Sequence, residues 1–577
     1  MVSQVTASGL PTVSRNEPHG IDDRQIPVHD PRVRDGVKAD EQREDKRGGP
    51  GLHYVTTAIP YVNAAPHLGF ALELVQADVL ARYHRLVGDD TWFLTGTDEN
   101  SLTNVLAADR EGVPIRSLVD RNAAVFRALA HRLHLSQDDF IRTATDPRHR
   151  DGAQRFWTAC AAAGDIYKRP YRGLYCVRCE RFYTTDELLG GRCPEHEIEP
   201  EVVEEENYFF RLSRYADQLS ELVTSRALRV VPESRHHEVQ AFIARGVTDF
   251  SISRTQARAR GWGIPVPGDP DQVMYVWFDA LTNYITALGY GSESARFRRS
   301  WINNPHRVHV IGKDILRFHA VYWPALLLSA GLPVPTRIIV HGFLTRDGRR
   351  MSKTLGTGID PAALATSWGV DTVRYWLLRE VPPADDADYT EASLARAYTA
   401  DLANDLGNLL QRTTSMLHRY RAGVIPTPAP GVVSPLQTTA EQLPGVLHQA
   451  LGEGWDPRVG LEAVFNLVGA GNRFVEDTKP WALARAEGGG DVDARQRLDR
   501  VLWNLAECLR LVAEALRPFL PETADRIVTH LGVALTANWT EALQWGGLPA
   551  GRQVAVPVPL FPKREPPRES LSAQKRL

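Results

Sequence analysis

The sequence predicts an α/β protein built on a doubly wound parallel sheet of the Rossmann type, interrupted by a cysteine-bearing insertion and followed by an α-helical bundle. Three observations predict this fold. Short β-branched runs alternate with amphipathic helical segments as far as about residue 390. Three of the five cysteines cluster between the two halves of that alternation, and only helical periodicity follows it. Alternating strands and helices favour a parallel sheet covered on both faces.

The bulk composition is that of an ordinary globular protein. The 577 residues leave room for three or four domains of about 150 residues each. Hydrophobic residues make up 43% and charged residues 24%. No run of 18 apolar residues and no apolar N-terminal segment occurs, so we expect neither a membrane span nor secretion. The net charge of −3 leaves a nucleic-acid partner open, and the overall expectation is a cytoplasmic multidomain protein.

The first half of the predicted Rossmann domain covers 51–150. "HYVTTAI", 53–59, reads as a buried strand, and an apolar-periodic helix follows at about 67–87. "TWFLTGTDE" is a second strand. Residues 1–50, which precede the predicted Rossmann domain, are polar, charged and without periodicity, and this predicts a disordered tail.

The second half, 251–390, repeats the alternation. "RVHVIG", 307–312, and "RIIVHGFL", 337–344, read as strands, with the helix "HAVYWPALLLSAG" between them. In doubly wound sheets, ligands bind beyond the carboxyl ends of the strands. Polar groups follow the predicted strand ends at His67, Asp98, Gly312–Asp314 and His341–Gly342.

The intervening insertion, 151–250, carries a predicted zinc site. Cys176, Cys179, Cys193 and His196 form two tight pairs joined by a short loop, a spacing that suits a tetrahedral Cys3His site. All four positions are filled, so we expect one structural Zn²⁺. Scattered reduced thiols are the alternative.

The third region, 391–550, is predicted to be a helical bundle. "LANDLGNLLQRTTSML" and "RLDRVLWNLAECLRLVAEAL" each place leucines on one helical face. The Pro-, Lys- and Arg-rich end, 551–577, is expected to be a flexible tail.

Two short groups carry candidate chemistry. "NAAPHLGFALE" puts His67 and Gly69 at a helix mouth, which attracts phosphate; His67 can donate to a phosphate oxygen, and Gly69 lets a flat adenine ring lie against the backbone. "DGRRMSKTLGTG" offers Arg349, Arg350 and Lys353 on a glycine-flanked loop, suited to the charge of a pyrophosphate leaving group. Taken singly, the first group is better explained as an ordinary helix start after Pro66, and the second resembles a solvated basic turn, which is common.

Together the two groups resemble the signature motifs of class I aminoacyl-tRNA synthetases. "HLGF" precedes "RMSKT" by some 280 residues, and "AIPYVNAAPH", "FLTGTDE", "YVWFDALTNYI" and "IGKDILRFHAVYWPA" resemble the methionyl-tRNA synthetase family. The resemblance runs from about 53 to 535 with its motifs in family order.

The resemblance implies roles for matching positions. Catalytic groups would be His67, Arg350 and Lys353, and ATP, with Mg²⁺, would meet His67, Gly69, Glu73, Gly312, Asp314 and Lys353. The methionine pocket would comprise Ala58, Ile59, Tyr61, Asp98, Trp277, Ala280, Tyr284, Ile315, His319 and Trp323. A thioether gains from aromatic contacts. Asp98 can pair with the substrate ammonium, and Tyr61 and His319 can mark the sulfur. The aromatic residues, taken singly, are equally typical of a core.

The bundle holds the implied RNA-reading residues. Asn408 and Arg412 lie four apart on one helix face, and Trp481 begins another helix. Such side chains bind and stack unpaired bases, although without the resemblance a solvated pair and a half-buried tryptophan are the preferred interpretation. The resemblance implies that they read the CAU anticodon of tRNA(Met). It also matches the cysteine pattern to the single-knuckle form of the family.

The sequence departs from the family at the adenylation centre. Phe70 stands where a second histidine is usual, and Asn100 and Ser101 replace histidine and glycine. Arg350 replaces a lysine and keeps the charge, and Thr354 replaces a serine. Phe70 cannot donate to the transferring phosphoryl group, and losing one such donor costs on the order of a hundredfold in turnover. Asn100 could compensate from nearby.

The expected function is therefore methionine–tRNA ligation, using ATP, L-methionine and tRNA(Met). Two alternatives remain open on the sequence: a paralogue that passes an activated amino acid to a non-tRNA acceptor, and an adenylation-dead tRNA-binding protein. Decay of the bundle residues would favour the first and decay of the amino-acid pocket the second, and neither is seen. A monomer is expected, since no added dimerisation module is evident.

Overall fold

The structure is a computed structural model that describes residues 51–177, 179–194, 197–351, 357–428 and 433–564. The predicted disordered tail, 1–50, therefore lies outside the described residues, as do His196, Lys353 and Thr354. No helix in the described ranges is long and apolar enough to cross a membrane.

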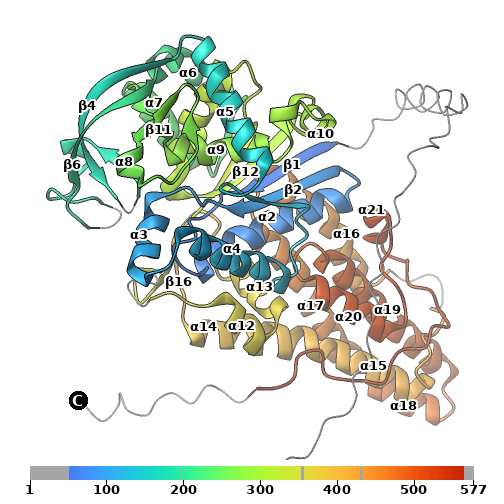
Figure 1. The fold of residues 1–577 in the computed structure, drawn as a ribbon. Helices are drawn as coiled ribbons and strands as arrows, with labels where there is room; N and C mark the ends of the chain where they lie inside the picture. The colour runs from blue at the N-terminus through green and yellow to red at the C-terminus, as the bar shows by residue number, and fades with distance from the viewer. Residues whose placement is uncertain (1–50, 178, 195–196, 352–356, 429–432, 565–577) are drawn as a thin grey trace, which may run out of the picture. The chain divides into compact units, whose positions relative to one another are not determined.

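The core is a six-stranded sheet in the order β3-β2-β1-β12-β13-β7, and every neighbouring pair is parallel (Figure 1). Its strands are β1 Leu52–Thr57, β2 Asp90–Thr97, β3 Asp139–Arg142, β7 Arg229–Val231, β12 His306–Gly312 and β13 Arg337–His341. The parallel Rossmann-type sheet is confirmed. Parallel strands are covered on both faces, which is why β1 and β12 are almost entirely buried and read as continuous apolar runs.

The strand order reverses between β1 and β12, which come from opposite halves of the sequence. Helix α2, Leu68–Leu86, follows β1 and packs on the sheet with 14 of its 19 residues buried. The predicted strand 337–344 ends early, at His341. At Gly342 the chain passes so close to the backbone of Asp385 that a Cβ would lie 2.1 Å from its carbonyl oxygen.

The insertion forms its own antiparallel sheet, ordered β5-β4-β6-β8, in which β5 is Arg181–Tyr183 and β8 is Phe250–Ser251. Strands β4, Ile166–Cys176, and β6, Glu201–Phe210, pair along their whole lengths. The segment 151–250 is not wholly separate, because β7 lies within it and pairs with β13 of the main sheet. A smaller sheet, β10-β11-β9, follows, with β9 Ser253–Thr255, β10 Pro265–Val266 and β11 Asp269–Met274.

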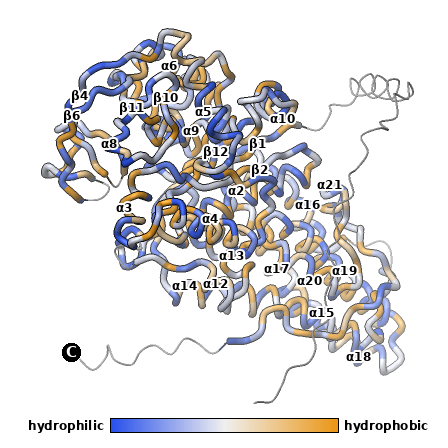
Figure 2. Tube along the Cα trace, viewed as in Figure 1, coloured by the Kyte–Doolittle hydropathy of each residue, from blue (hydrophilic) through white to orange (hydrophobic). Residues whose placement is uncertain are grey.

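From Pro361 to Ala542 the described chain is mostly helical, interrupted by the short strand β16, Ala387–Asp388. The longest are α13 Val370–Arg379, α15 Asn408–Arg421, α16 Pro435–Leu447, α17 Pro457–Thr478, α19 Val492–Leu516 and α20 Pro521–Leu531. Helix α19 is buried on all sides from Val501 to Leu516, as expected of a central helix. Its buried charges are paired within the helix and with the residue that follows it, Arg510 with Glu507 and Arg517 with Glu514. Figure 2 shows hydrophobic segments along α17, α19 and α20.

The bundle and the Rossmann domain share one continuous hydrophobic core that runs from Val55 through Leu72 to Leu509. Arg374 of α13 pairs with Asp78 of α2 at 2.8 Å, and both side chains are fully buried. Arg374 Nε also donates to the Phe519 carbonyl of the bundle at 2.8 Å, so Arg374 connects α2 with the bundle. Removing either member of the buried pair would leave an uncompensated charge.

The expected flexible tail does not begin at residue 551. Residues up to 564 lie along the bundle, with Val554 and Leu560 buried and the Tyr398 hydroxyl donating to the Pro562 carbonyl at 2.6 Å. The segment forms no long helix or strand, so its apolar residues show no period. Val554, Leu560 and Phe561 are nevertheless buried against the bundle, whereas Val556 and Val558 are exposed. Residues 565–577 lie outside the described ranges.

Candidate active site

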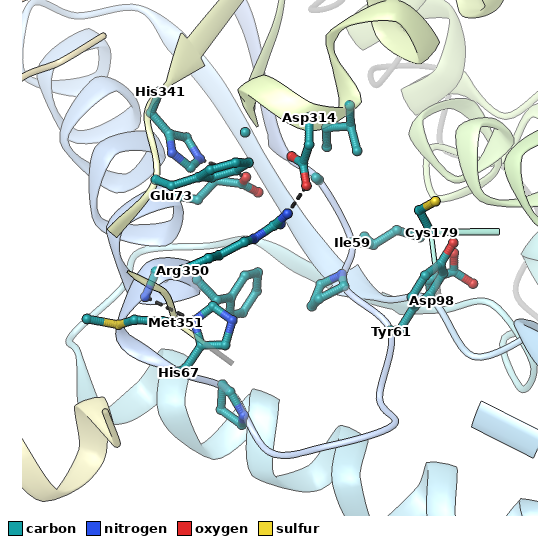
Figure 3. Close-up of a pocket in the computed structure, with 18 of the residues that line it drawn as sticks. Ile59, Tyr61, His67, Glu73, Asp98, Cys179, Asp314, His341, Arg350 and Met351 are labelled. Carbon is teal, nitrogen blue, oxygen red and sulfur yellow. Dashed lines mark hydrogen bonds and ion pairs between the residues drawn. The ribbon is translucent and has the colours of Figure 1, made fainter. Parts of the chain in front are cut away.

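A cavity of about 1080 Å³ opens where the strand order reverses, at the carboxyl ends of β1 and β12 (Figure 3). This is the ligand position of a doubly wound sheet. All five described members of the predicted ATP set line it, as do nine of the ten predicted methionine-pocket residues. Trp323 is the exception. It is fully buried behind Tyr284, with ring centroids 6.1 Å apart, and it supports the pocket from the core.

His67 caps helix α2 at the cavity mouth. Its Nδ1 accepts a hydrogen bond from the Gly69 N–H at 3.1 Å, so the neutral ring carries its proton on Nε2. A Cβ on Gly69 would lie 3.0 Å from this ring, so glycine makes room for the cap. The Leu68 N–H donates to the Ile359 carbonyl. The first N–H groups of the helix are therefore engaged within the protein, and phosphate attraction at this mouth falls to the helix dipole and the His67 side chain.

Glu73 and His341 form a buried pair across the sheet, with Oε2 3.0 Å from Nε2. Burial raises the pKa of Glu73. Burial alone lowers the pKa of His341, but the hydrogen bond and charge of Glu73 outweigh it and raise that pKa overall. The pair joins α2 to the end of β13 and so fixes the floor of the cavity.

Arg350 reaches across the cavity in Figure 3 toward Asp314. Its Nη2 lies 2.6 Å from Asp314 Oδ2, and its guanidinium lies 4.1 Å from the Phe343 ring centroid. The predicted basic loop and the end of β12 are thus brought together. A phosphate entering here would meet a cation already held by one carboxylate.

At the other end of the cavity, Asp98 and Tyr61 lie side by side in an isolated parallel bridge (Figure 3). Asp98 Oδ1 and the Tyr61 hydroxyl are buried and have no hydrogen-bond partner within the described part of the chain. Burial raises the pKa of Asp98 well above its usual value, and the charges of Asp279 and Glu180 raise it further. Such a carboxylate calls for a cationic ligand.

An apolar slot lies beside this acid. The Trp277 ring stacks on Phe318 with centroids 3.7 Å apart. Phe318 and His319 belong to a π-helical turn, η7, Phe318–Tyr322; such turns are frequent at functional sites. Ala58, Ile59, Ala280 and Ile315 complete the lining.

His319 is fully committed inside the protein. Its Nδ1 lies 2.9 Å from the Ile315 carbonyl, which only accepts, so Nδ1 carries the proton. Its Nε2 therefore accepts from the Tyr284 hydroxyl at 2.7 Å. Burial lowers the pKa of His319 to about 4, so the ring is neutral. Both ring nitrogens of His319 are thus engaged within the protein, and the expectation that His319 marks the sulfur stays a prediction; the Tyr61 hydroxyl has no partner among the described residues.

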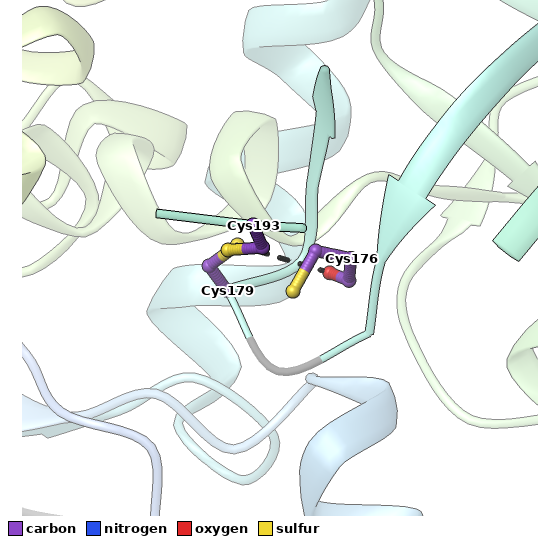
Figure 4. Close-up of side chains that lie close together, drawn as sticks. All are labelled: Cys176, Cys179 and Cys193. Atoms are coloured by element: carbon purple, nitrogen blue, oxygen red, sulfur yellow. Dashed lines mark hydrogen bonds between the residues drawn. The ribbon is translucent and has the colours of Figure 1, made fainter. Parts of the chain in front are cut away.

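The three described cysteines of the predicted zinc site are brought together (Figure 4). Cys179 Sγ lies 3.8 Å from Cys193 Sγ, and the Tyr183 hydroxyl is 3.3 Å from each. The thiolate-forming set fits a zinc-type ion, with His196 outside the described residues. Cys179 also lines the cavity, so the cluster borders the site.

The departures from the family pattern have distinct places. Phe70 lines the cavity and meets Phe126 edge to face, with ring centroids 5.2 Å apart. Asn100 Nδ2 donates to Asp279 Oδ2 at 2.7 Å, and Asn100 does not line the cavity. The suggestion that Asn100 replaces the missing donor is therefore wrong. Ser101 caps helix α3, Leu102–Glu111.

The predicted RNA-reading residues lie on the bundle surface. Asn408 is exposed at the start of α15, and Trp481 is 36% exposed in α18, Pro480–Gly488. Arg412 Nη2 lies 2.7 Å from Glu476 Oε1 of α17. Glu476 precedes Trp481 by five residues, so the pair links α15 to the chain segment that leads into α18.

The sequence reasoning assigned no role to four contributors, of which it had named only His341, as a polar group near a strand end. His341 and Phe126 line the cavity, and Glu180 and Asp279 raise the pKa of Asp98. His341 had a signal, since it follows a predicted strand end. The other three have none, because their effect exists only once distant segments meet.

Two family models match the chain. "tRNA synthetases class I (M)" matches residues 53–200 and 196–414, and "Anticodon binding domain of methionyl tRNA ligase" matches 435–574. Among similar proteins, a methionine–tRNA ligase of Brucella suis is 42% identical over 518 residues, covering 89% of this chain and 98% of its own. One of Mycobacterium tuberculosis is 42% identical over 525 residues, with the same coverages.

Solved structures agree in fold. Mycobacterium tuberculosis methionyl-tRNA synthetase in complex with methionyl-adenylate superposes with a TM-score of 0.84 at 41% identity, covering 89% of this chain and all of that one. The apo form of the same protein gives a TM-score of 0.78 at 39% identity, covering 90% of this chain and all of that one.

Proposed function

The chain belongs to the methionyl-tRNA synthetase family of class I aminoacyl-tRNA synthetases, and from that premise we propose how its own residues carry out the reaction. The protein is a methionine–tRNA ligase whose substrates are ATP, methionine and tRNA. The relatives do not support the two alternative functions, a non-tRNA acceptor and an adenylation-dead protein.

The observation that carries the site assignment is the pair of unpartnered buried atoms, Asp98 Oδ1 and the Tyr61 hydroxyl, beside an apolar slot. The ammonium of methionine pairs with Asp98, and the side chain enters the slot along Trp277. The Tyr61 hydroxyl is a donor for the thioether sulfur. His319 and Tyr284 position the wall rather than contact the sulfur, because they are hydrogen-bonded to each other.

ATP occupies the opposite end of the cavity. The adenine side lies near Gly69 and Gly312, and the phosphates face His67 Nε2 and Arg350. Lys353 adds a further cation on the same loop, by resemblance to the family. Mg²⁺ bound with ATP would supply neutralisation of the phosphate charge. Asp314, which holds Arg350 at 2.6 Å, releases it to the phosphates as nucleotide binds.

Catalysis proceeds by positioning and charge stabilisation. The methionine carboxylate oxygen attacks the α-phosphorus of ATP in line, and pyrophosphate leaves with its charge stabilised by His67 and Arg350. A 3′-terminal ribose hydroxyl of tRNA then attacks the carbonyl carbon of the adenylate, and AMP leaves. No protein nucleophile is needed, since both steps join groups held in one cavity.

A structural Zn²⁺ would be held by Cys176, Cys179 and Cys193, with His196 as the fourth ligand. It would fix the insertion beside the cavity, where Cys179, Tyr183 and Glu197 form part of the wall.

tRNA recognition is assigned to the bundle. Asn408 and Arg412 hydrogen-bond bases of a CAU anticodon and Trp481 stacks on one of them, with Arg412 exchanging Glu476 for RNA. We further assign the protein to the cytoplasm, where tRNA is charged, and to a monomeric state, which light scattering tests directly.

Methionine-dependent ATP–pyrophosphate exchange, followed by charging of a CAU-anticodon tRNA, tests the whole assignment. Exchange with charging is the expected result. Exchange without charging would contradict the tRNA step, and no exchange by the folded, zinc-loaded protein would contradict adenylation.

A further inference from the structure

A second group of side chains of metal-ligating types lies at the end of the sheet opposite the cavity, where β1 and β2 begin. His53 is at the start of β1, His84 is in the last turn of α2, and Asp89 is in the turn that leads to β2. One ligand atom of each lies within 4.8 Å of the others. The cysteine cluster belongs to the insertion and borders the cavity at the carboxyl ends of the strands, whereas His53 lies at the start of β1.

The three side chains converge on one carboxylate oxygen. Asp89 Oδ2 lies 2.8 Å from His84 Nδ1 and 3.4 Å from His53 Nδ1. The two imidazole rings stack with centroids 3.6 Å apart, and His306, at the start of β12, stacks on the other face of His53 at 4.3 Å. The His53 and His84 side chains are 10% and 11% exposed, and Asp89 is 20% exposed, so an ion could enter from solvent on the carboxylate side.

His53 supplies the observation that calls for a ligand. Its Nδ1 is a buried nitrogen without a hydrogen-bond partner among the residues the structure describes, and it faces Asp89. Ordinary packing accounts for the His84–Asp89 hydrogen bond, which closes the turn after α2, but it leaves this nitrogen unused. Gly51 leaves room for the Asp89 carboxylate, because a Cβ at position 51 would lie 2.7 Å from Asp89 Oδ1.

We propose that His53, His84 and Asp89 form a second metal site, which binds a divalent transition ion of the zinc type. Two imidazole nitrogens and one carboxylate oxygen suit Zn²⁺, with water as the fourth ligand, whereas Mg²⁺ and Ca²⁺ prefer oxygen donors alone. Binding requires the two rings to splay from their present interplanar angle of 21°, because a bound ion must lie near both ring planes.

A bound ion would hold together three segments that meet at one end of the sheet. His53 and Asp89 flank the paired starts of β1 and β2, and His84 holds the end of α2. The preceding residue, Tyr83, donates to or accepts from His448 of the bundle at 2.7 Å. An ion here therefore stabilises the edge against which the bundle packs, and the role is structural, remote from the reacting atoms.

Metal stoichiometry tests the proposal. The full-length protein is stripped, reloaded with Zn²⁺ and passed through gel filtration, and bound zinc is counted by atomic emission. The wild type should retain one equivalent more than His84→Asn and than His53→Gln. His237→Asn, which removes an exposed histidine of α7, Glu233–Ala244, is the matched control and should retain the wild-type amount.

Co²⁺ loading gives a second readout that does not depend on the variants. The cysteine cluster gives thiolate-to-cobalt charge-transfer bands, whereas the proposed site adds d–d bands without them. Wild-type protein with the cysteine cluster already filled by Zn²⁺ should still take up Co²⁺ with the second spectrum. No further Co²⁺ uptake, or equal zinc retention in His84→Asn and wild type, would overturn the proposal.

Discussion

Asp98→Asn is the sharpest test of how the amino acid is bound. The substitution keeps the shape of the side chain and removes its charge. Asp98 Oδ1 is buried without a partner among the described residues, and the neighbours that perturb it most, Asp279 and Glu180, are also acids. The substrate ammonium is thus the cation that this carboxylate requires.

The magnitude follows from the burial. Truncating one partner of a buried, hydrogen-bonded charge pair costs about 2–5 kcal/mol. At about 1.36 kcal/mol per factor of ten, kcat/KM for methionine should fall roughly 30- to 5000-fold. The KM for ATP should change little, because ATP contacts lie at the other end of the cavity. ATP–pyrophosphate exchange with each substrate varied in turn measures both.

The same substitution should stabilise the empty protein. The folded-state pKa of Asp98 is raised above its unfolded value, so the native state binds the proton more tightly than the unfolded chain. Stability from this group is present at low pH and is lost as pH rises through the two pKa values. Asp98→Asn should therefore raise the thermal midpoint at neutral pH while weakening methionine binding.

Asp90→Asn is the matched control, an exposed acid at the other end of the same strand that pairs with Arg299. It should leave both kinetic constants unchanged. A change of less than about threefold in kcat/KM for methionine in Asp98→Asn, or an equal loss for ATP, would refute the assignment.

Four further predictions concern single features. Phe70→His places a hydrogen-bond donor at the proposed ATP end of the cavity and should raise the kcat of ATP–pyrophosphate exchange at least about tenfold. The variant should lose about 1 kcal/mol of stability, because the edge contact with Phe126 is lost. Unchanged turnover would show that the cavity needs no donor there. Cys193→Ser should lower bound zinc and the thermal midpoint, measured by emission and calorimetry, and retention of full zinc would contradict the cysteine site. Trp481→Ala should raise the KM for tRNA about 5- to 150-fold, which corresponds to the loss of about 1–3 kcal/mol of base stacking. ATP–pyrophosphate exchange, which does not require tRNA, should be unaffected and serves as the internal control. His319→Gln removes a ring whose pKa is lowered from 6.5 to about 4 in the folded protein. Between pH 7 and pH 4 the wild type should therefore lose on the order of 3 kcal/mol more unfolding free energy than the variant, as measured by denaturant unfolding. Parallel pH profiles of the two proteins would contradict the buried neutral ring.

The central strands could be predicted from the sequence because each one is a recognisable run of residues by itself. β1 and β12 are β-branched and buried on both faces, so their apolar runs are continuous. The edge strands β3 and β7 have four and three residues, too few for any period, and only pairing with a neighbour makes them strands. The packed segment up to residue 564 escaped prediction for a related reason, since isolated apolar residues bury without forming a repeat.

The site was predictable in its position and less so in its chemistry. The strand order reverses between β1 and β12, so His67 and Glu73 from one half must face Gly312 and Asp314 from the other. Residue types at strand ends therefore locate the cavity. Which hydrogen bonds they make depends on the partner that folding supplies, as the Arg350–Asp314 pair shows.

The commitment of His319 changes how selectivity for methionine has to work. With Nδ1 bound to the Ile315 carbonyl and Nε2 accepting from Tyr284, the ring offers the ligand no donor. In the binding mode proposed above, the sulfur then meets one hydroxyl, that of Tyr61, and the face of an aromatic stack. A thioether gains from such polarizable contacts where a methylene of equal size gains less. Discrimination against aliphatic amino acids therefore rests on the fit of the slot and on that single hydroxyl, while the buried carboxylate of Asp98 supplies affinity for any α-ammonium group.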